Sequence, residues 1–543
     1  MNKIKNRSII STISLLLTLP FCLVSCNESG SEVNSDETIY LHVLNSEDYI
    51  DENVLTIFEE QNPGVKVIYE TFDTNENMYN ELKTGKANYD LINCSEYMVQ
   101  RLAGESLIQK VKGLETYLEN VSPYLVNKDY LNSDVINNSY KTGTNENTTY
   151  TPGKIDTINV TDAKTGDYLG RLSEYAIGYM WGTLGIVYNP TYSTFVDRGM
   201  SKERISEELN SDNGWSKFRD KDYKGVMSIK DSMRDTYALG ILEVYKEDFL
   251  KKEELSQEER NEIFNSHDPD TIEKVKNKLI ELKDNIFGFE VDSGKNDIVT
   301  GKIGMNLAWS GDATFSILQG EYYPGDDESY EEQKPDGERT ELYYALPSIG
   351  ANIWFDAWCM PLTVDPNSRN YEYACKFLNF LSETNTQTDD YDEEIGGIVE
   401  ANMSYTGYTS FISGANNEIF DYVVENYDVG GGSNTLDLSY FYHNNPSCVI
   451  EDIDPSSFEG RTLKAMYPEE SQIDSLYVMQ DFGEDNDKIV QMWEDVKVNP
   501  LPVFVVVLLV VILVGILGYL GTYKLVHKYK IKKRKELRAK LMN

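Results

Sequence analysis

Histidine and cysteine are scarce in this chain of 543 residues, which contains four histidines and six cysteines. It has no HExxH segment, no GxSxG segment and no CxxC pair. These absences exclude the usual signatures of zinc proteases, α/β-hydrolases and zinc-binding modules. The sequence therefore predicts no catalytic residue, no metal site and no cofactor.

The low cysteine count also excludes a disulfide scaffold, because only four cysteines remain outside the first 26 residues. They are spread widely along the chain, as Cys94, Cys359, Cys375 and Cys448. Two interpretations stay open for them, isolated buried thiols and a single disulfide.

Basic residues are few for a chain of this length. Fifty Lys and Arg stand against 90 Asp and Glu, which gives a net charge of −40 at pH 7. Both ends of the chain are basic, so the region between them carries about −51. Such a charge excludes nucleic acid as a partner. It would attract small cations, but acidic surfaces also serve solubility and are screened beyond about 8 Å at physiological salt.

The first long hydrophobic run is too short to span a membrane. Three basic residues precede an apolar stretch at 9–24, which is the pattern of a secretory signal. The stretch ends in Leu-Val-Ser-Cys at 23–26, which resembles a bacterial lipobox. We expect a lipoprotein-type signal peptide at 1–26 with Cys26 lipidated, followed by a tether at 27–37. A plain signal peptide with a chance cysteine is the alternative.

The second hydrophobic run lies near the other end, where residues 501–523 contain no charged side chain. About 20 residues suffice to cross a bilayer, so this run predicts a transmembrane helix. The tail at 524–543 has nine basic residues and one acid, which favours a cytoplasmic tail. We therefore expect a bacterial cell-membrane protein whose main region is extracytoplasmic.

Apolar runs of strand length alternate with segments of helical spacing in the exported region, and this alternation predicts an α/β fold with a parallel sheet. Strands are expected at 39–44, 65–69, 89–92, 303–309 and 342–346, and helices after Asp51 and at 75–82, 96–102 and 272–282. Two stretches, 141–174 and 429–460, read as insertions. The glycines at 430–432 indicate a loop, since no phosphate-binding pattern surrounds them.

Several short motifs follow one another in a fixed order, namely Leu44–Tyr49, Tyr69–Glu76, Tyr89–Ile92, Tyr179–Thr183, Asp231–Asp235, Trp309–Ala313 and Trp354–Asp356. In this order they resemble the spermidine/putrescine-binding proteins of ABC transporters, a family with the type II periplasmic-binding-protein fold. The resemblance extends over most of residues 38–495. It implies two lobes with a ligand cleft between them.

The resemblance also implies a set of ligand-contacting residues. Carried over position by position, they are Tyr49, Ser95, Tyr97, Asp231, Ser232, Asp235, Trp309, Trp354, Asp356, Tyr408 and Gln480. Ser232 stands where the family often has an acid, and Asp231 is the neighbouring substitute for that charge. Ser46 stands where well-known members have Trp, which leaves the choice between spermidine and putrescine open.

The chemistry of these side chains suits a polyamine, a flexible hydrocarbon rod with ammonium groups at intervals. A carboxylate hydrogen bond to an ammonium contributes roughly 1.5 to 3 kcal/mol, and a cation over an aromatic face about 0.5 to 2 kcal/mol. In an extended segment, Trp354 and Asp356 would face the same side. Asp235 follows an apolar run at 226–229, and open α/β sheets bind ligands at strand ends.

The resemblance implies that lobe 1 comprises 38–176 and 357–410, and that lobe 2 comprises 177–356 and 411–495. Closure of the lobes around a polyamine would signal a loaded receptor to a separate permease and, through it, an ATPase. The expected function is therefore solute binding without catalysis. Two alternatives remain, an anchored sensor of the same fold for another cation and an exported hydrolase that uses paired carboxylates.

Overall fold

The computed structural model describes residues 38–85, 88–128, 143–145, 148–150, 152–323, 332–385, 387–388, 394–428, 430–473, 475–498 and 503–541. The predicted signal peptide at 1–26, its Cys26 and the tether at 27–37 lie outside these residues.

Lobe 1 begins with three parallel strands, each followed by a helix. In chain order these are β1 (Ile39–Ser46), α1 (Glu52–Gln61), β2 (Val65–Phe72), α2 (Asn75–Lys83), β3 (Leu91–Ser95) and α3 (Glu96–Gly104). Asp51 caps α1 as predicted, because its side chain accepts a hydrogen bond from the backbone N–H of Asn53. The third strand begins two residues later than expected.

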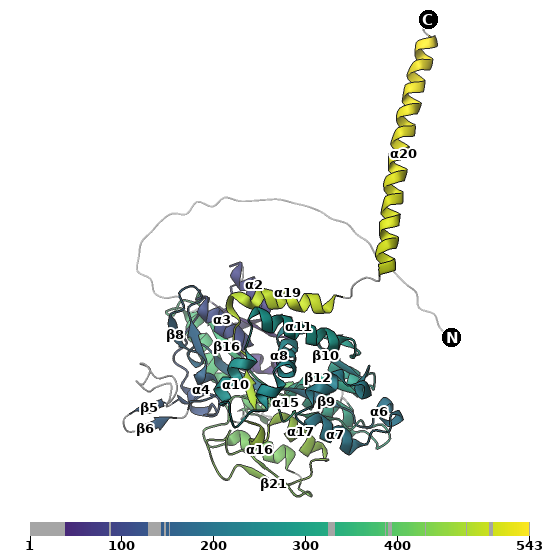
Figure 1. Cartoon of the computed structure of the whole chain (residues 1–543). Coiled ribbons are helices and arrows are strands. Elements are labelled where there is room, and N and C mark those ends of the chain that lie inside the picture. Colours follow the sequence, from purple (N-terminus) through teal and green to yellow (C-terminus); the bar gives the residue numbers. More distant parts are fainter. Residues whose placement is uncertain are drawn as a thin grey trace, which may run out of the picture. The chain divides into compact units, whose positions relative to one another are not determined.

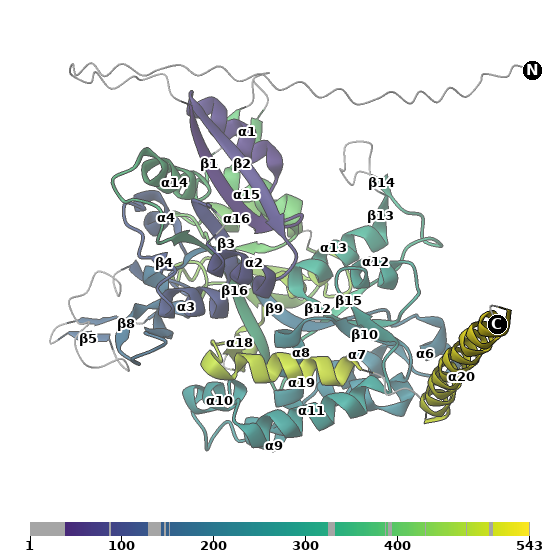
Figure 2. The same cartoon turned by 90° about the horizontal axis from the view of Figure 1, so that it is seen from above.

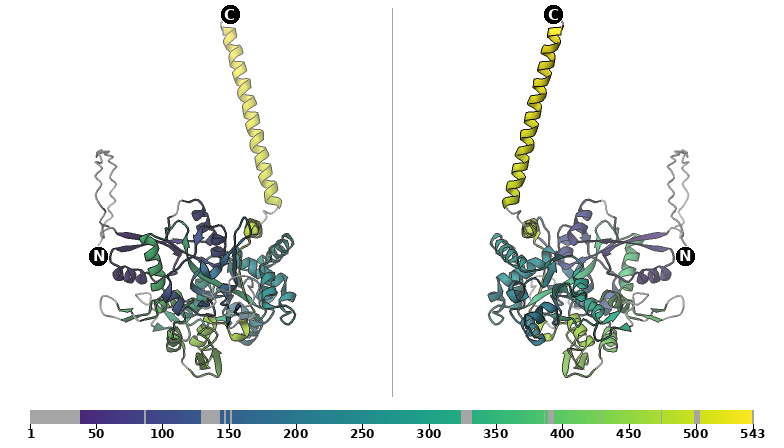
Figure 3. Two further views of the ribbon diagram at one scale, coloured as in Figure 1. Left: turned by 90° about the vertical axis from the view of Figure 1, so that its left-hand side faces the viewer. Right: turned by 90° about the vertical axis from the view of Figure 1, so that its right-hand side faces the viewer.

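Lobe 2 contains a second parallel group, in which β10 lies between β11 and β12. Its main elements are β10 (Met227–Lys230), α8 (Met233–Val244), α11 (Pro269–Lys283), β11 (Gly288–Glu290), α12 (Gly294–Val299), β12 (Met305–Trp309) and α13 (Ser310–Glu321). The predicted amphipathic helix is α11, and it buries Val275, Leu279 and Leu282. Figure 3 shows the purple strands of lobe 1 and the teal helices of lobe 2 at opposite sides of the folded region.

Two long strands join the lobes, β9 (Ile177–Tyr188) and β16 (Ala351–Pro361). They pair with each other antiparallel, and β9 continues along β12 whereas β16 continues along β3. The resulting strand order is β11-β10-β12-β9-β16-β3-β1-β2. In Figure 2 both strands run through the middle of the molecule, between the two groups of parallel strands. Every residue of β9 is buried.

The prediction of a parallel sheet is therefore correct for β1–β3 and for β10–β12 and wrong for the whole, because the sheet is mixed. A parallel connection needs a crossover segment, usually a helix, on one face of the sheet. The chain instead enters the second lobe through β9 and returns through β16, and both strands run against their neighbours β12 and β3. The two lobes share a continuous sheet for this reason.

The remaining elements extend both lobes (Figure 1). They include α7 (Lys202–Asn210), β15 (Tyr343–Ala345), α14 (Arg369–Phe380), α15 (Ile398–Thr406), β19 (Thr409–Ser410), α16 (Glu418–Tyr427), α17 (Phe458–Met466), β22 (Leu476–Val478) and α19 (Asn486–Lys497). The predicted insertions contain short hairpins, β5–β6 (Gly143–Asn145 and Thr148–Tyr150), β7–β8 (Asn159–Thr161 and Tyr168–Arg171) and β20–β21 (Asn434–Asp437 and Val449–Ile453). The four described cysteines are free and buried, which favours the isolated-thiol interpretation.

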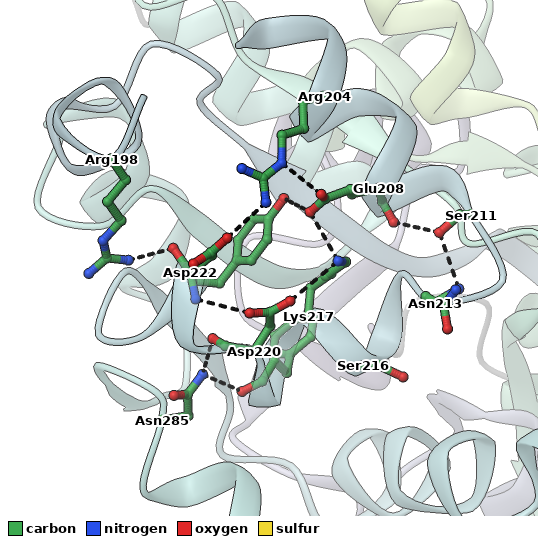
Figure 4. A network of polar contacts seen from close by, with 12 residues as sticks. Arg198, Arg204, Glu208, Ser211, Asn213, Ser216, Lys217, Asp220, Asp222 and Asn285 are labelled. Carbon is green, nitrogen blue, oxygen red and sulfur yellow. Dashed lines mark hydrogen bonds and ion pairs between the residues drawn. The ribbon is translucent and has the colours of Figure 1, made fainter. Parts of the chain in front are cut away.

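A polar network ties α7 to the two 3₁₀ turns that follow it, η4 (Trp215–Arg219) and η5 (Lys221–Tyr223). Arg204 forms ion pairs of 2.8 Å with Glu208 and with Asp222, and Lys217 approaches Glu208 at 3.0 Å (Figure 4). Most of these side chains are partly exposed, so each pair contributes little alone. The network fixes the surface of lobe 2 and contains none of the predicted ligand residues.

The predicted membrane span at 501–523 lies within helix α20 (Val503–Leu541), apart from its first two residues. Residues 501 and 502 and the side chains of 503–510 lie outside what the structure describes. In the part of the chain that is described, no helix combines the length and the apolar character needed to cross a bilayer. The spanning helix is therefore not confirmed.

Candidate ligand-binding site

Asp356 lies in β16, where this strand is paired on one side with Ser95 of β3 and on the other with Met180 of β9. Its carboxylate accepts a hydrogen bond of 2.7 Å from the hydroxyl of Ser95 and one of 2.9 Å from the hydroxyl of Tyr49. Burial raises the pKa of Asp356 to about 6, although these two bonds oppose the rise. No Lys or Arg forms an ion pair with Asp356 within the described ranges.

A chain of aromatic contacts begins at Tyr49, the tyrosine that bonds to this carboxylate. The Tyr49 ring meets those of Tyr179 and Tyr408 edge to face, with centroids 5.7 and 5.3 Å apart. Tyr408 in turn meets Trp354 at 5.4 Å. Asp356 thus contacts Tyr49 and Trp354 contacts Tyr408, and the two tyrosines contact each other, as expected if both side chains point to the same side of β16.

Trp354 is buried, and its indole N–H has no hydrogen-bond partner in the described structure. Its ring packs against Gly182 of the neighbouring strand, where an added Cβ would lie 2.6 Å from the ring. An unpaired buried N–H is costly unless water satisfies it. The absence of a side chain at Gly182 is what admits the indole.

Asp235 lies in the first turn of α8, directly after β10, and is buried. Burial raises the pKa of its carboxyl, while hydrogen bonds from Ser232 and Trp309 and the charges of Lys230 and Arg234 oppose this rise. The charge of Asp235 also contributes to the raised pKa of Asp356. The two acids therefore share one electrostatic environment, although Asp235 lies on α8 and Asp356 on the connecting strand β16.

Tyr97 is buried at the start of α3 and interacts with polar groups of α2. Its hydroxyl accepts a hydrogen bond of 3.1 Å from Asn75, whose side chain also bonds to Ser95. The guanidinium of Arg234 lies 4.4 Å from the Tyr97 ring, so this ring is already covered by a cation of the chain.

Three of the predicted ligand residues form their hydrogen bonds outside the cluster around Asp356. Asp231 faces α19, where it accepts a hydrogen bond from the indole of Trp493 and pairs with Lys497 at 3.2 Å. Ser232 serves as the N-cap of α8. The backbone of Gln480 bonds to the side chains of Asn265 and Arg234, which locks this segment to lobe 2.

Glu96 is a buried acid that the sequence did not single out. One of its carboxylate oxygens accepts the backbone N–H of Phe355 at 2.9 Å, and the other is buried without a partner. Burial raises the pKa of Glu96 to about 8, and the charge of Asp356 adds to this rise. An acid in the first turn of a helix is ordinarily an exposed dipole partner, so no sequence signal distinguished it.

Lys230 and Asp312 were missed as well. The ammonium of Lys230 is 2.8 Å from Asp312 and 3.3 Å from Glu290, and all three side chains are buried. Asp312 also accepts a hydrogen bond of 2.9 Å from Tyr408. The position of Lys230 at the end of an apolar strand, directly before the Asp231–Asp235 motif, was the one available signal.

Residues 53–405 match the family model described as bacterial extracellular solute-binding protein. The spermidine/putrescine-binding periplasmic protein of Escherichia coli is 25% identical over 65% of this chain and 75% of its own length. A putrescine-binding periplasmic protein of Pseudomonas aeruginosa is 25% identical over 63% of this chain and 73% of its own length.

A solved structure supports the fold independently. It is a Listeria monocytogenes protein assigned to a spermidine/putrescine ABC transporter, with a TM-score of 0.52 and 18% identity over 85% of this chain and 99% of that one. The two-lobed architecture is therefore confirmed, and the family match confirms that the chain is a binding protein rather than an enzyme. This chain belongs to the bacterial extracellular solute-binding protein family.

Proposed function

We propose that this protein is an extracytoplasmic polyamine receptor that delivers spermidine or putrescine to the permease of an ABC transporter. The observation that carries the proposal is the environment of Asp356. Its carboxylate has no cationic partner among the described residues and accepts a hydrogen bond from Tyr49, whose ring contacts Tyr408, which in turn contacts Trp354.

This environment suits an alkylammonium group. Ammonium donates hydrogen bonds to a carboxylate and is attracted to aromatic faces, whereas the adjoining methylenes need apolar walls. Asp235 supplies a second carboxylate that is likewise outside any ion pair of the described chain. Two such anchors, less the cost of ordering a flexible ligand, are compatible with micromolar affinity, about −8 kcal/mol.

The relatives support the same ligand class. The Escherichia coli relative is named as a spermidine/putrescine-binding protein, and the Pseudomonas aeruginosa relative is named as a putrescine-binding protein. Members of this kind require a separate permease and an ATPase for uptake, and this chain would serve as their solute-capturing component. The division into lobes at 38–176, 177–356, 357–410 and 411–495 is the corresponding domain hypothesis.

Membrane attachment forms part of the proposal. Acylation of Cys26 and a span at 501–523 with a cytoplasmic tail at 524–543 would hold the receptor close to its permease and raise the effective concentration of the two partners. Protease treatment of intact cells would test this arrangement. Removal of the main region with retention of a short membrane-bound C-terminal fragment supports it, and release of the whole chain into the soluble fraction contradicts it.

Calorimetric titration of the purified full-length chain with spermidine, putrescine and a neutral sugar tests the ligand class. Both amines should bind and the sugar should not. Asp356→Ala should weaken amine binding at least tenfold, because one ammonium loses its carboxylate. Asp365→Ala, an exposed acid in the loop after β16, is the matched control and should leave affinity unchanged. Sugar binding, or equal affinity in both variants, would exclude the proposal.

A further inference from the structure

Lys230 occupies an unusual position for a lysine, because its side chain is only 1% exposed. Its ammonium forms ion pairs with Asp312 and Glu290 and donates a hydrogen bond of 3.3 Å to the carbonyl of Val291. These carboxylates keep the pKa of Lys230 high, against the effect of burial, so the side chain remains charged. A buried, fully paired cation is thus built into lobe 2.

The same ammonium lies 4.5 Å from the ring centroid of Trp309. Trp309 is one of the aromatic residues that the family resemblance assigns to the ligand. The surroundings of Lys230, two carboxylates and an indole face, are those that a ligand ammonium would need. The chain therefore fills with its own side chain a position that is chemically suited to one ammonium of a ligand.

A second cation, in the first turn of α8, acts in the same way. Arg234 is buried, and its guanidinium lies over the rings of Tyr97 and Phe482 at 4.4 and 3.7 Å. Of the predicted aromatic residues, Trp309 and Tyr97 thus already contact a cation of the chain. In the described part of the structure, no Lys or Arg lies over Tyr49, Trp354 or Tyr408.

The carboxylates also fall into two groups, those paired with a cation of the chain and those without such a partner. Asp312 and Glu290 are neutralised by Lys230, and Asp231 is paired with Lys497. Asp235 and Asp356 are the predicted ligand acids that form no ion pair with any residue that the structure describes. Glu96 also forms no ion pair among the described residues, but burial raises its pKa to about 8, so it is mostly neutral at pH 7. The two predicted acids and one group of aromatic rings without a cation over them match a ligand that carries two ammonium groups.

We infer that Lys230 determines specificity, by occupying one ammonium position and so favouring a diamine such as putrescine over a triamine such as spermidine. This inference rests on the proposed function. A third ammonium near Trp309 would meet Lys230 at close range, and like charges in a buried environment repel strongly. A diamine that bridges Asp235 and Asp356 places only one ammonium in this region, beside Asp235, whose charge compensates it.

The test compares putrescine and spermidine by calorimetric titration of the full-length chain. The wild type should bind putrescine at least tenfold more tightly. The double variant Lys230→Met/Glu290→Gln removes one charge of each sign and leaves Asp312 beside Trp309, so it should shift the affinity ratio at least tenfold towards spermidine. Lys302→Met/Asp297→Asn, which removes a partly exposed ion pair of 2.8 Å, is the matched control and should keep the wild-type ratio.

The possible outcomes separate the two proposals. If neither amine binds the wild type, the proposed function fails. If both bind, but spermidine binds as tightly as putrescine or the double variant keeps the wild-type ratio, the role of Lys230 is excluded. If the double variant is not folded, as judged by the loss of cooperative unfolding, the wild type is titrated with the two monoacetylated spermidines instead. At least one should bind more tightly than spermidine, since it has lost one charge, and weaker binding of both overturns the inference.

Discussion

The hydroxyl of Tyr49 donates a hydrogen bond of 2.9 Å to Asp356, although 307 positions separate the two residues in the sequence. Tyr49 follows β1 in lobe 1, and Asp356 lies in the strand that connects the lobes. This bond lowers the pKa of Asp356, which burial raises. The ionisation state of this carboxyl, and with it the attraction for a cation, therefore depends on residues from distant parts of the chain.

Amine binding should strengthen as the pH rises from 5 to 7.5. The pKa of Asp356 is raised to about 6, so the carboxyl is mostly neutral at pH 5 and mostly ionised at pH 7.5. A neutral carboxyl offers a cation little attraction, and we expect about a tenfold change in Kd across this interval. Titrations at several pH values, with ionic strength held constant, measure it. A flat profile would show that Asp356 does not titrate on binding.

Tyr49→Phe should move that pH profile upward. Loss of the hydrogen bond removes stabilisation of the ionised carboxylate worth roughly 1.5 kcal/mol, which corresponds to about one pKa unit. The midpoint of the binding profile should rise by that amount, while the affinity at pH 8 changes little. Tyr179→Phe, which alters a neighbouring tyrosine that bonds to the backbone of Tyr49, is the comparison. An unchanged midpoint in Tyr49→Phe contradicts this role.

Asp356→Asn should stabilise the ligand-free protein at neutral pH while it abolishes high-affinity binding. The folded-state pKa lies above the usual value of 3.8, so the folded state retains a proton that the unfolded state releases. The contribution of this carboxyl to stability is therefore present at low pH and lost as the pH rises through about 6.

The amide cannot ionise and avoids this loss, which is about 1 to 3 kcal/mol at pH 7.5 after allowance for partial exposure. Thermal unfolding at pH 4 and pH 7.5 provides the measurement. The variant should have the higher midpoint at pH 7.5 and no advantage at pH 4. A lower midpoint at both values would mean that the hydrogen bonds from Ser95 and Tyr49 outweigh the cost of ionisation.

Gly182→Ala should weaken amine binding at least tenfold. The new Cβ would lie 2.3 Å from the hydroxyl oxygen of Ser310 and 2.6 Å from the Trp354 ring, both too close, so the indole must move. Calorimetry measures the affinity, and the tryptophan emission spectrum reports the displacement. Gly288→Ala is the control, since nothing lies within 4 Å of its added Cβ. Wild-type affinity in Gly182→Ala would show that the ring position does not matter.

Local patterns were sufficient for most elements of the fold. The strands near 39, 65 and 305, the cap at Asp51 and helix α11 agree with the sequence prediction, because side-chain periodicity and capping depend on neighbours within a few residues. Strand direction across the sheet did not follow from these patterns. Nothing local distinguishes β9 or β16 from a buried parallel strand, since both are apolar on two faces.

The candidate site likewise has a part that the sequence predicted and a part that it did not. Tyr49, Ser95 and Asp356, three of the residues that the family resemblance assigns to the ligand, lie together in one hydrogen-bonded cluster. Asp231 and Ser232 are adjacent to Asp235 in sequence, yet their side chains leave the cluster, because Asp231 turns towards α19 and Ser232 caps α8. The direction of these two side chains depends on the residue at which α8 begins. The order of the motifs along the sequence does not specify that residue.

The sequence by itself determined the family, the alternation of strands and helices and the types of side chain available to a cation, because these are properties of composition, spacing and motif order. Tertiary structure alone decided which charges remain free. Lys230 neutralises Asp312 and Glu290, and Arg234 covers Tyr97, only because strands and helices from distant segments bring them within a few ångströms. The attraction between two charges depends on their distance in space and not on their separation in the sequence. Only the folded structure therefore determines which charges pair.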